Sequence, residues 1–143
     1  MIILDANVVS EPLRPLPDPN VIAWLDDQIP ERLYIPSMVI GEILFGVASL
    51  PAGRRKNSLS NAYNELLGEF EGRIVPFDEV AARHWAAMNA TAARMGRPLG
   101  IKDGIIAATA AARGFAVATR NTADFDFTGV QCINPWLYGS ASA

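Results

Sequence analysis

Short apolar runs alternate along this chain with longer stretches in which apolar residues recur every three or four positions. The short runs are rich in Ile, Leu and Val and are typical of buried strands, whereas the longer stretches predict amphipathic helices. Strands are expected over residues 2–4, 33–35, 74–77, 115–118 and 130–133. This alternation predicts an α/β fold with a central parallel sheet of four to five strands and helices on both faces.

Polar and glycine residues at the ends of the periodic stretches predict where the helices begin and end. After a Pro-rich loop over 12–19, Asn20 is expected to cap the first helix. The other helices are expected to begin at Ser37, after the polar break 51–57, at Asp78 and near Lys102, and the last two to end at Gly96 and Gly114. We expect a single domain over residues 1–136, followed by a disordered tail over 137–143.

The composition is that of a globular protein, with half of its 143 residues apolar. No stretch reaches the ~20 apolar residues that a membrane-spanning helix needs. Asp5 and Glu11 near the start argue against a basic secretory signal. Cys132 is the only cysteine, which excludes an internal disulfide and fits a reducing compartment. We therefore expect a cytoplasmic protein without a membrane partner.

Four acids stand where this pattern turns from strand to helix: Asp5, Glu42, Asp103 and Asp124. The carboxyl ends of the strands in an open α/β sheet share one edge, so these residues are expected to meet in space. Apposed carboxylates repel one another, and a cluster of ionised acids usually implies a bound cation. The pattern predicts the active site of a metal-dependent nuclease.

Each acid also has a simpler structural interpretation when it is taken alone. Asp5 could cap a helix or form a turn, and Asp103 falls in the first turn of a helix, where the macrodipole favours an anion. Asp124 could form an Asx turn, and Asp126 could replace it at the site. Glu42 differs from an ordinary surface Glu because its neighbours are apolar. Only the four together favour a site.

An oxygen-only ligand set favours Mg²⁺, or Mn²⁺, over zinc. The single histidine, His84, lies beside the apolar stripe of a predicted helix and is expected to be structural, so no Ser-His-Asp arrangement is available. The chain also has no glycine-rich phosphate loop of the GxGxxG or GxxxxGK type. The absence of both glycine-rich motifs excludes the two commonest classes of nucleotide-binding α/β protein.

The net charge of −3 argues at first against a nucleic-acid partner. However, four of the 15 acids are the proposed ligands, and the 11 that remain face 12 Lys and Arg. Bound divalent ions would neutralise the site itself. The charge evidence is therefore neutral.

Several longer stretches resemble one known family. They are ILDANVVSEPLR near the start, the helix around Glu42, KDGIIAATAAARGFAVATRNTADF, and NPW at residues 134–136. With this spacing the chain, over residues 1 to about 136, resembles a PIN-domain protein of the VapC toxin family, most closely its FitB-like branch. The acidic set of that family falls on Asp5, Glu42, Asp103 and Asp124.

The resemblance implies a toxin of a toxin–antitoxin pair that cleaves single-stranded RNA with Mg²⁺. It also implies a homodimer and a small DNA-binding antitoxin as partner. We expect an antitoxin tail to place an Arg among Asp5, Glu42 and Asp103. A groove for it could lie between the helix with Ile22, Trp24 and Leu25 and the helix with Leu44, Phe45 and Val47.

Two positions depart from the family pattern. Ala6 replaces the usual Thr after the first acid, so a hydroxyl contact is expected to be missing there. Asn121 stands where some FitB-like members carry an acid, which leaves open whether Asp124, or Asn121 through a water, completes the site. Asn7 is expected to orient a carboxylate or a metal-bound water. Thr119 and Arg120 are expected to contact phosphate.

Two other classes of function compete with the nuclease. A receiver-type signalling domain also has an acidic Mg²⁺ pocket, but it needs adjacent acids after the first strand, and Asp5 has Leu4 and Ala6 beside it. The second alternative is a non-catalytic PIN-like regulatory module that acts with a DNA-binding partner.

Overall fold

Five parallel strands form the centre of the protein, seen in a computed structural model that describes residues 1–140. The sheet has the order β3-β2-β1-β4-β5. The strands are β1 (Ile2–Leu4), β2 (Leu33–Pro36), β3 (Ile74–Val75), β4 (Ala116–Ala118) and β5 (Cys132–Ile133). Ile3 of β1 lies in register with Tyr34 of β2 and with Val117 of β4. The predicted parallel sheet is confirmed, with strands at β3, β4 and β5 that are shorter than expected.

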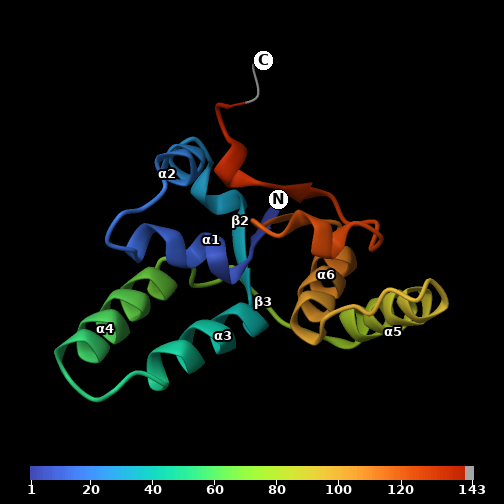
Figure 1. Cartoon of the computed structure of the whole chain (residues 1–143), viewed down its shortest axis with the longest axis horizontal. Helices are drawn as coiled ribbons and strands as arrows, with labels where there is room; N and C mark the ends of the chain where they lie inside the picture. The colour runs from blue at the N-terminus through green and yellow to red at the C-terminus, as the bar shows by residue number, and fades with distance from the viewer. Residues whose placement is uncertain (141–143) are drawn as a thin grey trace.

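Six α-helices and four short 3₁₀ turns surround this sheet in the described residues. Figure 1 shows α5 and α6 packed together on one side of the molecule and α3 and α4 on the other, with α1 next to α3. The helices are α1 (Ala6–Ser10), α2 (Pro19–Asp26), α3 (Ser37–Ala48), α4 (Arg54–Gly68), α5 (Glu79–Arg94) and α6 (Ile101–Arg113). The 3₁₀ turns are η1 (Glu11–Leu13), η2 (Pro30–Arg32), η3 (Thr122–Phe125) and η4 (Pro135–Leu137).

Helices cover both faces of the central strands. Ile3 and Leu4 of β1 are both buried, as are Val117 and Ala118 of β4. Consecutive strand residues point to opposite faces, so burial of both members of each pair requires cover on both sides. No helix among residues 1–140 is long and apolar enough to cross a membrane.

The order of the strands determines where a site can form. β1 lies at the centre with β2 on one side and β4 on the other, so the chain changes direction across the sheet at β1. In such folds the connections after neighbouring strands diverge at this point and leave a crevice at the carboxyl edge. Asp5 follows β1 directly and therefore lies at that crevice.

The main error of the sequence prediction lies between β1 and α2. Residues 6–10, where no helix was predicted, form α1, and the Asp5 side chain accepts a hydrogen bond from the first N–H of this helix. The cap of α2 is Asp18 rather than Asn20, because Pro19 already lies in the first turn. Asn20 instead donates its side-chain amide to the Trp136 carbonyl oxygen.

Other boundaries agree more closely. Asp78 caps α5 as predicted, and Gly114 ends α6 in the left-handed conformation with φ 69°. α4 begins at Arg54, inside the expected polar break. Residues at 137 and 138 belong to the fold, because η4 ends at Leu137 and the Tyr138 hydroxyl donates to Asp27. The rest of the predicted tail stays a prediction, and residues 141–143 lie outside those described.

Replacing Asp18 with Ala tests which residue caps α2. The Asp18 carboxylate accepts a hydrogen bond from the Asn20 backbone N–H at 2.8 Å. We expect Asp18→Ala to lower the free energy of unfolding by ~0.5–2 kcal/mol, as for other N-caps. Asp26→Ala in the last turn of the same helix is the matched control, and it should leave stability unchanged or slightly higher. Equal urea midpoints for the two variants would contradict the assigned cap.

Candidate active site

Asp5 is the most firmly held acid of the four. Its side chain is 6% exposed, and each carboxylate oxygen accepts one hydrogen bond. Oδ1 accepts from the Ala6 backbone N–H at 2.8 Å, and Oδ2 accepts from the Thr119 hydroxyl at 2.7 Å. Asp5 therefore does cap a helix, as the structural interpretation predicted, yet its charge also acts on Glu42 and Asp103.

Thr119 holds Asp5 from the neighbouring strand. The residue is fully buried at the end of β4, and its hydroxyl also accepts a hydrogen bond from the Asn121 backbone N–H at 3.1 Å. The prediction that Thr119 contacts phosphate was therefore wrong, because its hydroxyl is buried and engaged. Asp5 thus accepts a hydroxyl hydrogen bond from Thr119, although Ala6 offers none.

Glu42 lies in the second turn of α3, in a partly buried position. Its Oε2 atom lies 3.8 Å from the Lys102 ammonium. The Oε1 atom is buried and has no hydrogen-bond partner among the described residues. Desolvation raises the pKa of Glu42, and the charge of Asp5 raises it further, whereas Lys102 acts in the opposite direction. A buried oxygen without a donor is where a cation would find a ligand.

Asp103 lies in the first turn of α6 and is half-buried. Its pKa is raised by desolvation first, and then by the charges of Asp124 and Asp5. The helix macrodipole, which favours an anion here, does not offset these effects. Asp103 is thus electrostatically linked to Asp5 on one side and to Asp124 on the other.

Asp124 is exposed in η3 and lines a cavity of about 330 Å³ together with Asp103. Asp126 lies near Cys132, whose pKa is raised mainly by desolvation and then by the charges of Asp126 and Asp5. Asn121 uses its backbone N–H to bind Thr119. Among the candidates for the fourth position, the structure therefore brings Asp124 beside Asp103.

Comparison with known proteins identifies the family. The protein-family model described as PIN domain matches residues 2–129 of this chain. The chain belongs to the PIN-domain family. It is 45% identical to the VapC ribonuclease Y4jK of Sinorhizobium fredii over 95% of this chain and 98% of that protein. It is 44% identical to the toxin FitB of Neisseria gonorrhoeae over 95% of this chain and 99% of that one.

A solved structure shows the same fold at high similarity. The crystal structure of FitAcB from Neisseria gonorrhoeae, a toxin–antitoxin complex, superimposes with a TM-score of 0.91 at 44% identity. The match covers 95% of this chain and 99% of that chain. The predicted membership in the PIN domains is thus confirmed.

The acids of this PIN domain suit a hard cation in their chemistry. All four offer carboxylate oxygens, the ligands that Mg²⁺ and Mn²⁺ prefer. Among the described residues, the Oε1 atom of Glu42 has no hydrogen-bond partner, and the pKa values of Glu42 and Asp103 are raised. The negative charge at this edge of the sheet is therefore only partly compensated. Among residues 1–140, however, no three Asp, Glu, His or Cys side chains converge closely enough to surround a metal ion as they are placed. Ligation would require side-chain rotation.

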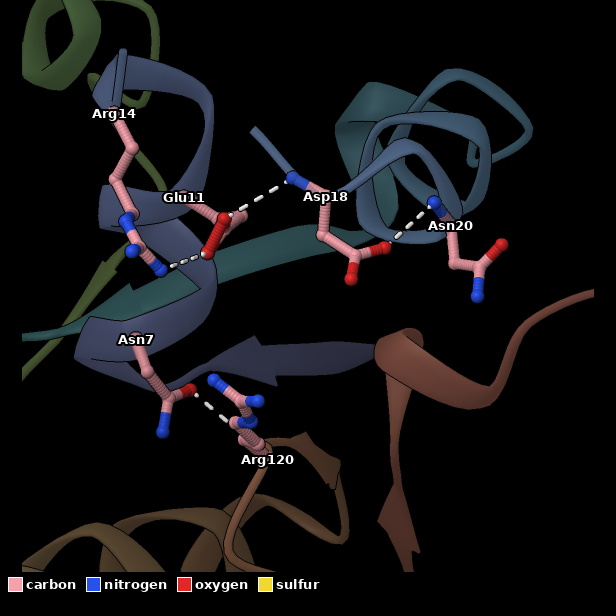
Figure 2. Close-up of polar contacts among 6 residues, drawn as sticks. All are labelled: Asn7, Glu11, Arg14, Asp18, Asn20 and Arg120. Carbon is pink, nitrogen blue, oxygen red and sulfur yellow. Dashed lines mark hydrogen bonds and ion pairs between the residues drawn. The ribbon is translucent and has the colours of Figure 1, made fainter. Parts of the chain in front are cut away.

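Two polar contacts next to the site were not predicted. Lys102, just before Asp103, pairs with Glu42. Glu11 is 2% exposed and accepts hydrogen bonds from the Arg14 guanidinium and the Asp18 backbone N–H, which holds the turn between α1 and α2 (Figure 2). Lys102 was visible as a charge at the start of a helix. Nothing in the sequence marked Glu11 as buried.

Asn7 and Arg120 lie together at the same edge. The Asn7 side-chain oxygen accepts a hydrogen bond from the Arg120 backbone N–H at 3.4 Å (Figure 2). Asn7 therefore positions the chain after β4, and no contact with an acid of the site is seen. His84 is exposed on α5 and lines another cavity, which contains none of the four acids.

The structure changes which residues could line the predicted antitoxin groove. Trp24 is 4% exposed and belongs to the core, so it cannot line a surface groove as expected. On α3, by contrast, Leu44 is 39% and Phe45 is 74% exposed. A cavity of about 350 Å³ between α1, α3 and α4 reaches from Glu42 to Tyr63. Among the described residues, exposed large apolar side chains thus lie on α3 and not on α2.

Replacing Asp103 with Asn tests the repulsion among the acids. Because the pKa of Asp103 is raised in the folded state, its ionised form destabilises the fold. Asp103→Asn should therefore raise Tm by a few degrees, ~2–4 °C, at pH 7 in the presence of a chelator. This increase in Tm should become smaller as the pH falls through the raised pKa of Asp103. It should vanish below the pKa range of ordinary aspartates.

Glu65→Gln on the exposed face of α4 is the control for loss of one negative charge, and it should leave Tm at pH 7 nearly unchanged. Thermal denaturation monitored by circular dichroism measures both. A fall in the Tm of Asp103→Asn at pH 7 would mean that the helix-start role of Asp103 outweighs the repulsion.

Proposed function

We propose that this PIN domain is the toxin of a toxin–antitoxin pair and acts as a Mg²⁺-dependent endoribonuclease on single-stranded RNA. The observation that carries the proposal is the negative edge at which Asp5, Glu42, Asp103 and Asp124 act on one another. Relatives over nearly the whole chain are named a VapC ribonuclease and a toxin. Together they favour a nuclease over a receiver domain or a passive module.

Each acid has a distinct part in the proposed chemistry. A divalent ion bound at this edge would lower the pKa of a water molecule and offset charge on the scissile phosphate. Asp5, held on both oxygens, and Asp103, in the first turn of α6, are the residues that would hold the ion most rigidly. Asp124 is exposed and would therefore be accessible to the substrate.

Glu42 suits a proton-accepting role as well as ligation. Its raised pKa makes the neutral form more favourable than in an ordinary surface carboxylate, and among residues 1–140 its Oε1 atom has no hydrogen-bond partner. A base with a raised pKa still accepts a proton from the attacking water and holds it more strongly. Lys102, 3.8 Å from Glu42, offsets part of its charge.

The proposed partner is a small DNA-binding antitoxin that covers this edge. A guanidinium fits paired carboxylates in a bidentate manner, so an antitoxin Arg among Asp5, Glu42 and Asp103 would occupy the place of the cation. The adjoining cavity between α1, α3 and α4, together with the exposed Phe45 of α3, would anchor the antitoxin chain. We place the pair in the cytoplasm and the toxin in a homodimer.

Metal dependence is the first test of the proposed nuclease. Purified protein should cleave single-stranded RNA with Mg²⁺ or Mn²⁺, lose this activity in EDTA and regain it with either ion but not with Zn²⁺. Asp5→Asn should reduce the cleavage rate about a hundredfold or more, since several kcal/mol of charge stabilisation are removed. The rate is measured on a labelled RNA by gel electrophoresis.

Asp26→Asn serves as the matched control, because Asp26 is exposed on α2 and should retain full activity. Circular dichroism checks whether Asp5→Asn remains folded. Undiminished cleavage in EDTA would overturn the metal mechanism. Absence of cleavage by the wild type with either ion would favour the non-catalytic regulatory module.

Phe45 tests the antitoxin surface. The residue is 74% exposed, so Phe45→Ala should leave Tm nearly unchanged. The same change should weaken binding of the protein encoded by the adjacent upstream reading frame by about tenfold or more, as loss of an apolar anchor does. Leu16→Ala, at a residue that is 90% exposed elsewhere, is the control for loss of surface apolar area. Isothermal titration calorimetry measures both, and equal affinity for the two variants would exclude this surface.

A further inference from the structure

Two arginines at the acidic edge are stacked on aromatic rings. The Arg97 guanidinium carbon lies 5.0 Å from the centroid of the Phe127 ring, and that of Arg120 lies 5.2 Å from the centroid of a Trp136 ring. Both arginines are exposed. Stacking restricts the motion of a guanidinium but leaves the N–H groups along its edge free to bind a ligand.

Arg97 belongs to the wall of the acidic cavity. It lies in the loop between α5 and α6 and lines the same cavity as Asp103, Asp124 and Phe127. Its backbone N–H donates to the Ala92 carbonyl at 3.0 Å, which ties the loop to the end of α5. The cation is thus placed beside two of the four acids by a fixed backbone.

Arg120 reaches the same edge from another segment. It follows Thr119, which binds Asp5, and its backbone N–H donates to Asn7 (Figure 2). Its stacking partner Trp136 is anchored as well, since the Trp136 carbonyl accepts a hydrogen bond from the Asn20 side chain at 2.9 Å. Residues distant in sequence therefore hold this guanidinium in place.

Within the part of the chain that the structure describes, the N–H groups of both guanidinium groups are free of hydrogen-bond acceptors. Among residues 1–140, no hydrogen bond or ion pair engages the side chain of Arg97 or Arg120. Arg73 provides the contrast, because it also stacks on a ring, that of Phe70, but donates to the carbonyls of Leu33 and Glu69. Arg73 therefore serves the fold, whereas Arg97 and Arg120 keep their donors available.

We propose that Arg97 and Arg120 each bind a backbone phosphate of the single-stranded RNA substrate and so hold the strand across the acidic edge. This inference rests on the proposed nuclease function. A protein of net charge −3 with clustered acids repels a polyanion, so productive binding requires cations placed beside the site. Guanidinium groups match phosphate oxygens in a bidentate manner. Phe127 and Trp136 are positioning residues in this arrangement.

Equilibrium binding of RNA tests the two contacts directly. We use the Asp103→Asn protein, which should not cleave, and a short fluorescein-labelled single-stranded RNA in Mg²⁺ buffer. Arg97→Gln and Arg120→Gln should each raise Kd about three- to tenfold by fluorescence anisotropy. Each should also reduce the slope of log K against log salt by ~0.7, the value for one lost phosphate contact on a single strand.

Arg113→Gln is the matched control, because Arg113 is exposed in the last turn of α6 and also carries one positive charge. It should leave both Kd and the salt slope unchanged. In proteins that retain Asp103, Arg97→Gln and Arg120→Gln should raise KM by a similar factor while kcat changes by less than about twofold, which indicates loss of ground-state binding.

The stacking partner gives a separate test. Trp136→Phe keeps an aromatic face and should retain RNA affinity, whereas Trp136→Leu should weaken binding nearly as much as Arg120→Gln. The double variant Trp136→Leu/Arg120→Gln should bind RNA no more weakly than Arg120→Gln alone, because the Trp136 ring acts only through the Arg120 guanidinium. Additive losses would overturn the positioning role of Trp136.

The outcomes separate this inference from the proposed nuclease. If the wild type cleaves RNA while the Arg97 and Arg120 variants keep Kd, KM and salt slope, the arginines only join loops or contact an acidic protein partner, and the inference is overturned. If the wild type neither cleaves nor binds RNA, the proposed nuclease itself fails.

Discussion

The hydrogen bond between the Thr119 hydroxyl and the Asp5 carboxylate is the contact on which the arrangement of the site depends. It joins the end of β4 to the end of β1 across 114 residues of sequence, in a buried position. A buried carboxylate is costly unless it is hydrogen-bonded, and bonds to a charged group contribute roughly 1.5–3 kcal/mol. Thr119 on one side and the first N–H of α1 on the other meet this need.

The other acids are placed around this fixed carboxylate at an electrostatic cost. The pKa values of Glu42 and Asp103 are raised because both are partly desolvated and both lie near other acids. Lys102 compensates Glu42 only in part, at a distance of 3.8 Å. Uncompensated repulsion between like charges is typical of functional sites, where a bound ligand of opposite charge reduces it. The fold holds the acids in place, and the repulsion among the acids lowers the stability of the fold.

The rim of the site shows a second constraint, which concerns cations. Arginines that serve the fold, such as Arg73, give their N–H groups to backbone carbonyls. Arg97 and Arg120 are held instead by ring faces, which restrict a guanidinium without occupying its donors. A negative edge that could hold a cation, with fixed positive groups beside it, is the combination that the proposed RNA substrate would require.

The sequence by itself determined the sheet, most helix boundaries and the positions of the four acids, because these follow from local periodicity and capping. Asp78 begins α5 and Gly114 ends α6 as predicted, since a side-chain cap and a left-handed φ are local features of the chain. Only the tertiary structure decided that Thr119 is buried against Asp5, that Trp24 belongs to the core, and that Asp124 rather than Asp126 lies beside Asp103. Those facts depend on contacts between segments far apart in the chain, and the spacing of residues in a sequence carries no information about which distant side chain will fill a given space.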